Sequence, residues 1–559
     1  MKQDIASILK ESAINVGIDN PIIELTHPED ISHGDFSSNI ALAHSKNLKM
    51  KPSDLALKIV DEFKKINSND LYTLSVAGPG FINIKIKDSY FSEEILKIYK
   101  DVKSFGKLNI DKGREVMVEY TDPNPFKVFH IGHLMTNTIG ESLSRIAEFT
   151  GAKVIRACYQ GDVGMHVAKT IWAIMQDGNY KDDIKYLGDM YVVGSKKFED
   201  DETAKKEIIE VNKKIFEKSD NDINKIYDAG RKLSLGYFDT IYEKLGTKFN
   251  NFFFESEVAD DGVKIVKEFL KKNIFIESEG ATVFPGEKYG EHTRVFINSQ
   301  GLPTYEAKEL GLTQRKFELY PKLDESVVIT ANEQDAYYKV IMAVLREIYP
   351  DIAKKTKHLS HGILRPSSGK MSSRKGNIVS AEVLIREFEI LVEEKIKDRD
   401  FSPDEKKSIC NDVAIAGLKY TILRQSIGGD IIYDPTKAIS FEGDSGPYLQ
   451  YATVRAQAVI NKSNKEISID KLPDSVSLLE KMILRFPEVI ERSRKEYAPH
   501  HIITYLTELS SAFNSYYAQN QIIDEKDQIS PYRIALTKVF VEIMKNGLWL
   551  LGIRVPKRM

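Results

Sequence analysis

The chain has 559 residues, of which 42% are hydrophobic and 29% are charged, and its net charge is −3. This length and composition are typical of a folded protein with three or four domains and exclude wholesale disorder. The slightly negative charge also excludes a global positive field, so a nucleic acid would have to be bound by local basic patches.

The sequence also lacks the features of a disulfide-linked, exported or membrane protein. Cys158 and Cys410 are its only cysteines and form no CxxC pair, so neither a disulfide framework nor a thiolate zinc site is expected. The N-terminus has no apolar signal-peptide core, Asp4 and Glu11 disfavour a transit peptide, and no apolar stretch is long enough to cross a membrane. We therefore expect a soluble cytoplasmic protein without membrane contact.

The first part of the chain, residues 1–112, predicts a small N-terminal α/β domain. Helices are expected near residues 2–14 and 53–65. A strand at 81–86 follows the glycine- and proline-rich turn at 78–80.

The second part, residues 113–380, predicts a doubly wound parallel sheet of the Rossmann type. A strand-like run at 116–118 leads into a helix with one apolar face, Gly151 ends that helix, and residues 154–159 again have a strand pattern. A strand, a crossover helix and a second strand in this order form a βαβ unit, which implies parallel strands.

A charge-rich helical insertion is predicted at about residues 169–290 of this domain, after which strand patterns return at 293–298 and 326–330. Amphipathic helical patterns then dominate the rest of the chain. They predict a helical connecting segment at 381–440 and an all-α bundle at 441–559.

The first segment that indicates chemistry is Pro123–His133, at the junction of the first strand and its helix. A helix N-terminus has free N–H groups and a partial positive charge, so it suits a phosphate chain. The imidazoles of His130 and His133 add donors without permanent charge, and Gly132 lets a base or ribose approach the backbone. The segment predicts an ATP site, although the two histidines can equally be a helix cap and a buried core residue.

A second segment, Gly369–Gly376, has the sequence GKMSSRKG. Three cations and two hydroxyls between glycines suit a loop that closes over a polyphosphate. Lys370, Arg374 and Lys375 would neutralise the charge that develops on the α-phosphate and on the leaving pyrophosphate. A solvated basic turn is the plain alternative.

In this order the two segments resemble the HIGH and KMSKS signatures of class I aminoacyl-tRNA synthetases. The resemblance implies catalysis by His130, His133, Lys370 and Lys375. It also implies that ATP is bound by Lys127, His130, Gly132, His133, Lys370, Met371, Ser372, Ser373 and Arg374.

Within class I the chain resembles the arginyl-tRNA synthetase family, because Val118–Pro125, Leu302–Glu309 and Ala331–Asp335 are similar to that family's amino-acid-binding segments. A guanidinium is planar, permanently charged and carries five donors, so its pocket needs carboxylates and neutral acceptors in fixed positions. Singly, such residues can also be surface charges, helix partners or core aromatics. The resemblance implies that arginine is bound by Glu119, Asn124, Tyr305, Glu309 and Gln334.

The sequence departs from the family pattern at three positions. Asp122 stands where serine is usual, Glu309 where aspartate is frequent, and Val163 where tryptophan often follows Asp162. These departures put individual contacts in doubt more than the resemblance itself.

The resemblance extends to both ends of the chain. Ser32–Leu42 is similar to the additional N-terminal domain of arginyl enzymes, which implies contact with the tRNA elbow, and the segments 443–452 and 547–559 are similar to the anticodon-binding bundle. Tyr516 and Tyr517 could stack on anticodon bases, but aromatic residues of a bundle are more often core.

The implied activity is arginine–tRNA ligation: L-arginine is activated with ATP and transferred to the terminal adenosine of tRNA(Arg), with release of AMP and pyrophosphate. The resemblance also implies transfer to the 2′ hydroxyl and activation that requires tRNA. Magnesium is expected to arrive with ATP. No zinc or other resident metal is expected, and the protein is expected to be a monomer.

Three alternatives stay open at this stage. Another class I synthetase, such as a cysteinyl or methionyl enzyme, commonly needs zinc ligands that two distant cysteines cannot supply. A small-molecule nucleotidylyltransferase would leave the N-terminal domain and the helical bundle without a role. A non-catalytic tRNA-binding paralogue would be expected to have eroded signatures, and both are intact here.

Overall fold

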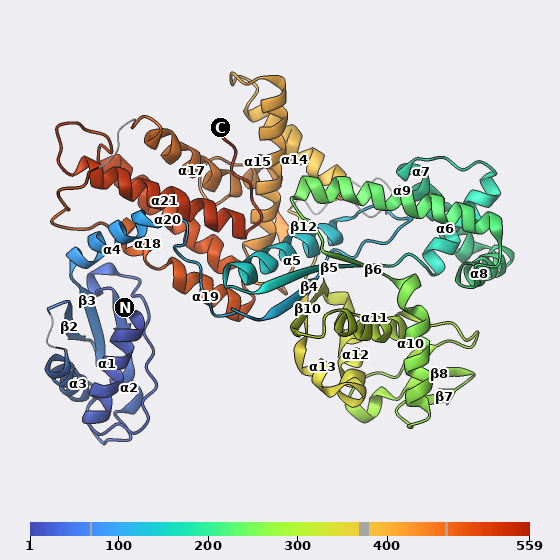
Figure 1. Cartoon of the computed structure of the whole chain (residues 1–559), viewed down its shortest axis with the longest axis horizontal. Helices are drawn as coiled ribbons and strands as arrows, with labels where there is room; N and C mark the ends of the chain where they lie inside the picture. Colours follow the sequence, from blue (N-terminus) through green and yellow to red (C-terminus); the bar gives the residue numbers. More distant parts are fainter. Residues whose placement is uncertain (68–69, 368–379, 464–467) are drawn as a thin grey trace. The chain divides into compact units, whose positions relative to one another are not determined.

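The computed structural model of the chain describes residues 1–67, 70–367, 380–463 and 468–559 (Figure 1). The chain folds into two compact units, and segments distant in sequence contribute to each. Unit 1 consists of Met1–Phe105, Gln457–Phe486 and Ser511–Glu542, and unit 2 of Gly106–Ala456, Pro487–Ser510 and Ile543–Met559.

Unit 1 contains the N-terminal α/β domain. Its antiparallel sheet has the order β1-β3-β2, with α3 packed on β2 and β3 and α1 packed on α3. The apolar side chains of α3 face the core, and the predicted helices and the predicted strand of this region are confirmed. The elements are α1 (Lys2–Asn15), β1 (Phe36–Ser38), α2 (Ile40–His44), α3 (Pro52–Ile66), β2 (Tyr72–Ala77), β3 (Phe81–Ile86) and α4 (Asp88–Lys100).

Helical segments from the end of the chain complete unit 1. Lys481 of α18 forms an ion pair with Asp35 at 2.8 Å, and both side chains are largely buried. Tyr532 of α21 donates a hydrogen bond to Glu480. The helices concerned are α18 (Leu478–Ile483) and parts of α17 (Gly446–Ile460), α20 (His500–Gln519) and α21 (Ser530–Leu550), which also contribute to unit 2.

Unit 2 is built on a five-stranded parallel sheet in the order β11-β10-β4-β5-β6. The predicted βαβ unit is confirmed as β4, α5 and β5, and α5 packs on β4, β5 and β10 (Figure 1). Gly140 permits the close packing of α5, because a Cβ there would lie 2.2 Å from the ring of Tyr120. The elements are β4 (Glu115–Glu119), α5 (Ile131–Phe149), β5 (Lys153–Gln160), β6 (Asn251–Phe254), β10 (Leu323–Ala331) and β11 (Thr356–His361).

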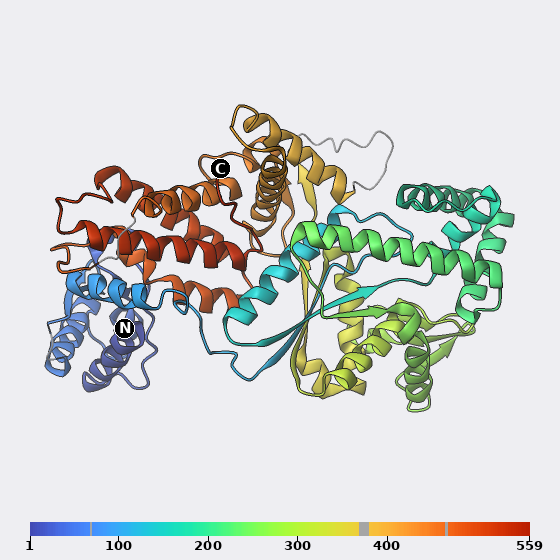
Figure 2. The same cartoon turned by 45° about the horizontal axis from the view of Figure 1, so that its top comes forward.

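The segment predicted as a helical insertion is mostly helical, and the long helix α9 packs on α6, α7 and α8 (Figure 2). It also contains β6, which pairs with β5 in the central sheet and which the sequence pattern does not reveal. Four residues are too few to show a strand period between two long helices. The helices of this region are α6 (Met165–Asp177), α7 (Ile184–Asp200), α8 (Glu202–Glu217), α9 (Asn221–Leu245) and α10 (Glu255–Leu270).

The strand predicted at 293–298 is present as β9 (Arg294–Ile297), but it is not part of the central sheet. It pairs antiparallel with β8 (Ala281–Phe284), which pairs with β7 (Ile276–Ser278). A strand pattern alone carries no information about its partner, so only tertiary pairing assigns β9 to this small sheet.

Helices dominate the rest of unit 2. α14 packs on α15, and α15 packs on α5. A short parallel pair links β12 (Leu364–Pro366) with β13 (Ile431–Tyr433). The helices are α11 (Tyr305–Leu319), α12 (Asp335–Ile348), α13 (Pro350–Lys355), α14 (Ala381–Lys395), α15 (Pro403–Leu423), α16 (Pro435–Ala438) and most of α19 (Phe486–Glu496). No helix among the described ranges is both long and apolar enough to cross a membrane.

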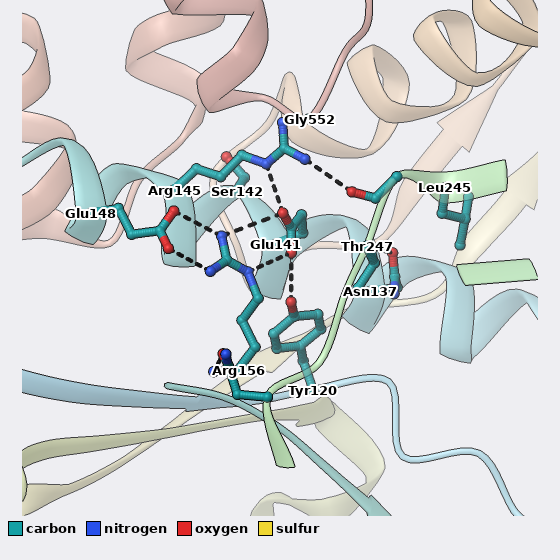
Figure 3. A network of polar contacts seen from close by, with 12 residues as sticks. Tyr120, Asn137, Glu141, Ser142, Arg145, Glu148, Arg156, Leu245, Thr247 and Gly552 are labelled. Carbon is teal, nitrogen blue, oxygen red and sulfur yellow. Dashed lines mark hydrogen bonds and ion pairs between the residues drawn. The ribbon is translucent and has the colours of Figure 1, made fainter. Parts of the chain in front are cut away.

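A buried polar network surrounds Glu141 in the middle of α5 (Figure 3). Its carboxylate accepts hydrogen bonds from Tyr120 at 2.6 Å and pairs with Arg145 at 2.6 Å and Arg156 at 3.0 Å. Burial alone would raise its pKa, but the two guanidiniums hold the pKa of Glu141 below its ordinary value.

The same network binds the C-terminal segment of the chain to α5. Arg145 donates to the backbone oxygens of Trp549 at 2.9 Å and Gly246 at 3.0 Å, and Ser142 donates to that of Leu550 at 2.9 Å. Because these acceptors lie far from α5 in the sequence, the helix is fixed from several sides.

We expect Glu141→Gln to lower the free energy of unfolding by about 3 kcal/mol, because it leaves two buried guanidiniums without their shared carboxylate. Urea denaturation of the two proteins measures the difference. The matched control is Glu115→Gln, whose partner Lys153 is mostly exposed, so no measurable change is expected there. Equal stability of Glu141→Gln and wild type would contradict a stabilising role for the network.

Candidate active site

The first signature forms the junction between β4 and α5. His130 is the N-cap of α5: the N–H of Gly132 donates to Nδ1 of His130 at 3.1 Å, and the N–H of His130 donates to Nδ1 of His133 at 3.2 Å. The two rings stack with their centroids 3.5 Å apart. The histidines are therefore a helix cap, as the plain alternative proposed, and they also stand together at the helix N-terminus.

Burial and the cap together define the chemical state of this imidazole pair. Burial, with a smaller contribution from Lys127, lowers the pKa of His130 to about 4. Burial, followed by His130 and Lys127, lowers the pKa of His133 well below its ordinary value. Both rings are neutral at pH 7, and because Nδ1 accepts a backbone N–H, the proton is on Nε2. Two neutral Nε2–H donors are thus available beside free N–H groups of the helix.

Gly132 has a packing reason of its own. A Cβ at this position would lie 3.0 Å from Cε1 of His130. A side chain at position 132 would therefore collide with the stacked histidines. That Gly132 also lets a nucleotide approach the backbone stays a prediction.

The second signature, with Lys370, Met371, Ser372, Ser373, Arg374 and Lys375, lies outside the described residues. Its C-terminal flank is described: Ser380 forms an antiparallel bridge with His130, and the N–H of Ala381 donates to the oxygen of Phe129 at 2.8 Å. Ser380 and Ala381 are the first described residues after the second signature, and both contact the first signature.

The loop between β4 and α5 is held in an unusual conformation. Thr121, Asp122 and Phe126 are not glycines, yet they have φ angles of 82°, 48° and 67°. Backbone strain of this kind is found where the surrounding structure fixes it, often at functional sites. One fixed point is visible here, because the carboxylate of Asp122 accepts the N–H of Tyr159 at 2.7 Å.

A buried acidic cluster lies at the end of β4. Glu119 is 1% exposed and pairs with the buried Lys316 of α11 at 2.7 Å. Burial raises the pKa of Glu309 to about 8, against the attraction of Lys316. Burial and the nearby Glu119 raise the pKa of Asp122 well above its ordinary value. The cluster therefore holds more carboxyl groups than it can ionise with one lysine present.

A second group of side chains lies beside this cluster. A Cβ on Gly161 would lie 2.3 Å from Oδ1 of Asn124 and 3.3 Å from Oε1 of Glu255, so these two side chains meet at the glycine. Glu255 forms a buried ion pair with Lys308, whose Nζ also lies 4.4 Å from the ring of Tyr305. Tyr305 is 56% exposed, so its side chain is accessible to solvent.

Glu255 and Lys308 belong to this group, and the sequence analysis did not single them out. Glu255 directly follows β6, and recognition of that strand would have placed it at the carboxyl edge of the sheet. Lys308 lies within the segment 302–309, but nothing in its sequence context distinguishes a buried lysine from a solvated one. Both are identified by burial and pairing alone.

Gln334 ends the short 3-10 helix Asn332–Gln334, directly after β10, and its side chain is exposed. Since β10 and β4 are parallel neighbours, with Val328 opposite Glu119, Gln334 lies at the same edge of the sheet as the acidic cluster.

Glu119, the imidazole pair, Glu255 and Gln334 lie at or directly after the carboxyl ends of parallel strands, where ligands bind in doubly wound sheets. The groups of α11 reach the same place through the pairs Lys316–Glu119 and Lys308–Glu255. The helix N-terminus with its neutral imidazoles suits an anionic phosphate chain. The neighbouring carboxylates suit a cationic, many-donor side chain. In the described ranges, no group of three or more His, Cys, Asp and Glu residues could hold a metal ion.

Family models match almost the whole chain. The model described as "tRNA synthetases class I (R), catalytic domain" matches residues 95–434, which is more than half of the chain. The model "Arginyl tRNA synthetase N terminal domain" matches residues 1–86, and "DALR anticodon binding domain" matches residues 449–559.

Individual proteins give the same result. The chain is 28% identical over 576 residues to an "Arginine--tRNA ligase" of Clostridium perfringens, with 100% of both chains covered. It is similar in structure to the arginyl-tRNA synthetase of Thermus thermophilus, with a TM-score of 0.79, 21% identity and 100% of both chains covered. The corresponding values for the Plasmodium falciparum enzyme are 0.77 and 18%, with 100% of this chain and 99% of that chain covered.

Proposed function

This chain belongs to the class I arginyl-tRNA synthetase family, the arginine–tRNA ligases, and on that premise we propose which of its residues bind arginine and which bind ATP. The observation that carries the proposal is the junction of β4 and α5, where Glu119 and Asp122 of the buried acidic cluster are followed on one short segment by the imidazole pair. A cationic amino acid and a triphosphate need these two environments side by side.

Arginine occupies the acidic side of the junction. Its guanidinium is held by the carboxylates of Glu119 and Glu309, with Asn124, Tyr305 and Gln334 as further contacts. Glu255 adds a carboxylate beside Asn124. Support comes from burial, because low-dielectric surroundings strengthen a charge-assisted pair and make a substrate without the guanidinium costly to bind.

ATP occupies the helix side. The N–H groups of α5, Lys127 and the Nε2–H donors of His130 and His133 hold the phosphates, and Gly132 leaves the backbone accessible. The residues of the second signature also bind the polyphosphate, and the pairing of Ser380, just after that signature, with His130 supports this assignment. Magnesium arrives bound to ATP, and no resident zinc takes part.

The reaction then needs positioning and charge neutralisation rather than covalent chemistry by the protein. A carboxylate oxygen of arginine attacks the α-phosphorus, and the bond to the leaving pyrophosphate breaks. Lys370 and Lys375 stabilise the charge that develops on the phosphates. A ribose hydroxyl of the terminal adenosine of tRNA(Arg) then attacks the carbonyl carbon, and AMP leaves.

Binding of tRNA is divided between the ends of the chain. The C-terminal helices bind the anticodon, which the description of the family model at residues 449–559 supports. The N-terminal domain contacts the tRNA elbow, which rests on the resemblance of Ser32–Leu42 to the additional domain of arginyl enzymes. Tyr505, Phe513, Tyr532 and Phe540 are buried, whereas Tyr516 and Tyr517 are partly exposed, and Tyr517 stacks on Phe513.

The test is ATP–pyrophosphate exchange with each amino acid in turn, with and without a tRNA(Arg) transcript. Among the amino acids, only arginine should support exchange. Arginylation of the transcript should release AMP. Turnover with another amino acid in place of arginine would overturn the assignment of substrates to these residues.

A further inference from the structure

A cavity of about 510 Å³ lies in unit 2, away from the candidate active site. It is formed at the amino ends of β4, β10 and β11, whereas the candidate active site follows the carboxyl ends of the strands. At about 3.3 Å per residue, the five residues of β4 alone separate the two by roughly 16 Å. The lining residues are Ile110, Asp111, Arg114, Asp324, Glu325, Lys354, Lys355, Thr356, Lys357, Arg494, Lys495 and Tyr497.

The floor of this cavity is a closed cluster of two acids and two arginines. Arg494 is 8% exposed and pairs with Asp111 and with Glu325, each at 2.7 Å. Arg114 pairs with the same two carboxylates at 2.7 and 3.0 Å, and Tyr497 donates a hydrogen bond to Glu325. Burial opposes ionisation, but these partners hold the pKa of both acids below the ordinary value. The floor is therefore fully paired.

The rim of the cavity carries lysines that the floor cannot neutralise. Lys355 donates to a backbone oxygen at 2.8 Å, and Lys357 lies 4.0 Å from the ring of Tyr497; among the residues that the structure describes, neither forms an ion pair. Lys354 and Lys495 pair only with neighbours on their own helices, and all four side chains of these pairs are substantially exposed. Such pairs are weak in water.

The charges of the lining do not balance. Six cationic and three acidic side chains line the cavity, a surplus of three positive charges on a chain with a net charge of −3. Lysine ammonium groups are compact point charges that bind phosphate groups readily. The volume lies in the range of about 300–1,000 Å³ that small-molecule sites occupy.

We infer that this cavity is a second ligand site, separate from the one that binds substrate ATP, and that it takes a small molecule with two or more linked phosphate groups. Lys355 and Lys357 supply the contacts, with Lys354 and Lys495 at the mouth, and the two acids of the floor are paired with arginines. The third lining acid, Asp324, accepts the N–H of Glu115 at 2.9 Å. Tyr497 and the half-exposed Ile110 form an apolar wall for the rest of the ligand.

The probe for this site is inorganic tripolyphosphate, titrated calorimetrically into the full-length protein. Wild type should bind it in two steps, one in each site. Lys355→Gln/Lys357→Gln should weaken one step by about tenfold or more, since hydrogen bonds to charged groups are lost. Lys370→Ala should weaken the other step. The double variant retains the alkyl stems, and its arginylation rate without added probe should equal that of wild type.

The matched control is Lys264→Gln/Lys267→Gln, two lysines of α10 outside the cavity, and it should bind as wild type does. A single binding step that Lys370→Ala abolishes would overturn the inference. So would an unchanged isotherm for Lys355→Gln/Lys357→Gln. If that variant lost affinity for tRNA while tripolyphosphate bound only at the active site, the lysines would serve RNA, and the small-molecule site would again be excluded.

Discussion

Replacing His130 by asparagine should slow ATP–pyrophosphate exchange with arginine by about 100-fold or more, which is the usual cost of removing one preorganised donor from a charge-developing transition state. Asparagine is a good N-cap residue, so it replaces the Nδ1 acceptor that binds Gly132. It does not replace the Nε2–H donor. Stopped-flow or exchange kinetics at saturating ATP measure the loss.

Stability is the control for this variant. Because the cap is retained, the thermal midpoint of His130→Asn should stay close to that of wild type, and His292→Asn, at an exposed position, should change neither quantity. Full activity of His130→Asn would contradict the proposed donor role. Loss of activity together with a large fall in the midpoint would instead indicate that the imidazole serves the helix only.

The KM for arginine should fall about ninefold from pH 6 to 7 and about fivefold from pH 7 to 8, because one proton must leave before the cation binds. The group is Glu309, whose pKa burial raises to about 8. Below that pH the carboxyl is protonated in the free protein, and a guanidinium binds its ionised form. Affinity therefore rises with pH and levels off above pH 8. Steady-state kinetics with saturating ATP measure the slope.

The groups that face Glu309 define the controls for this titration. Lys316 favours ionisation, Glu119 and Glu255 oppose it, and Tyr338 stabilises the ionised form by a hydrogen bond. Glu309→Gln should bind arginine weakly and without the pH slope. Glu306→Gln, on the same helix, should retain the slope. A slope that persists in Glu309→Gln would assign the proton to another group of the cluster.

The geometry of the first signature was predictable from sequence because it is local. The cap, the helix start and the imidazole pair all lie within Pro123–His133, and a helix N-terminus is recognised from such a segment alone. The βαβ unit was likewise predicted, since the periods of its strands and its helix are properties of neighbouring residues.

Pairing between distant residues could not be predicted in this way. Nothing in the pattern around Lys316 indicates a lysine that is 2% exposed and paired with Glu119, and the partnership of Glu255 with Lys308 spans 53 positions. Burial of an ionisable group depends on what several segments bring to it. The raised pKa of Glu309 and the arginine-lined floor of the cavity at the amino ends of the strands likewise result from contacts between remote segments.

The sequence by itself determined the helices α1, α3 and α5 and the strands β3, β4, β5, β9 and β10 of the first two domains. It also predicted which short segments bind phosphate and guanidinium groups. Only the tertiary structure decided that β6 belongs to the central sheet and β9 does not. It also decided which carboxylates are neutralised by lysines. The physical reason is that local patterns depend on neighbouring residues, whereas strand partners, burial and charge balance are set where remote segments meet.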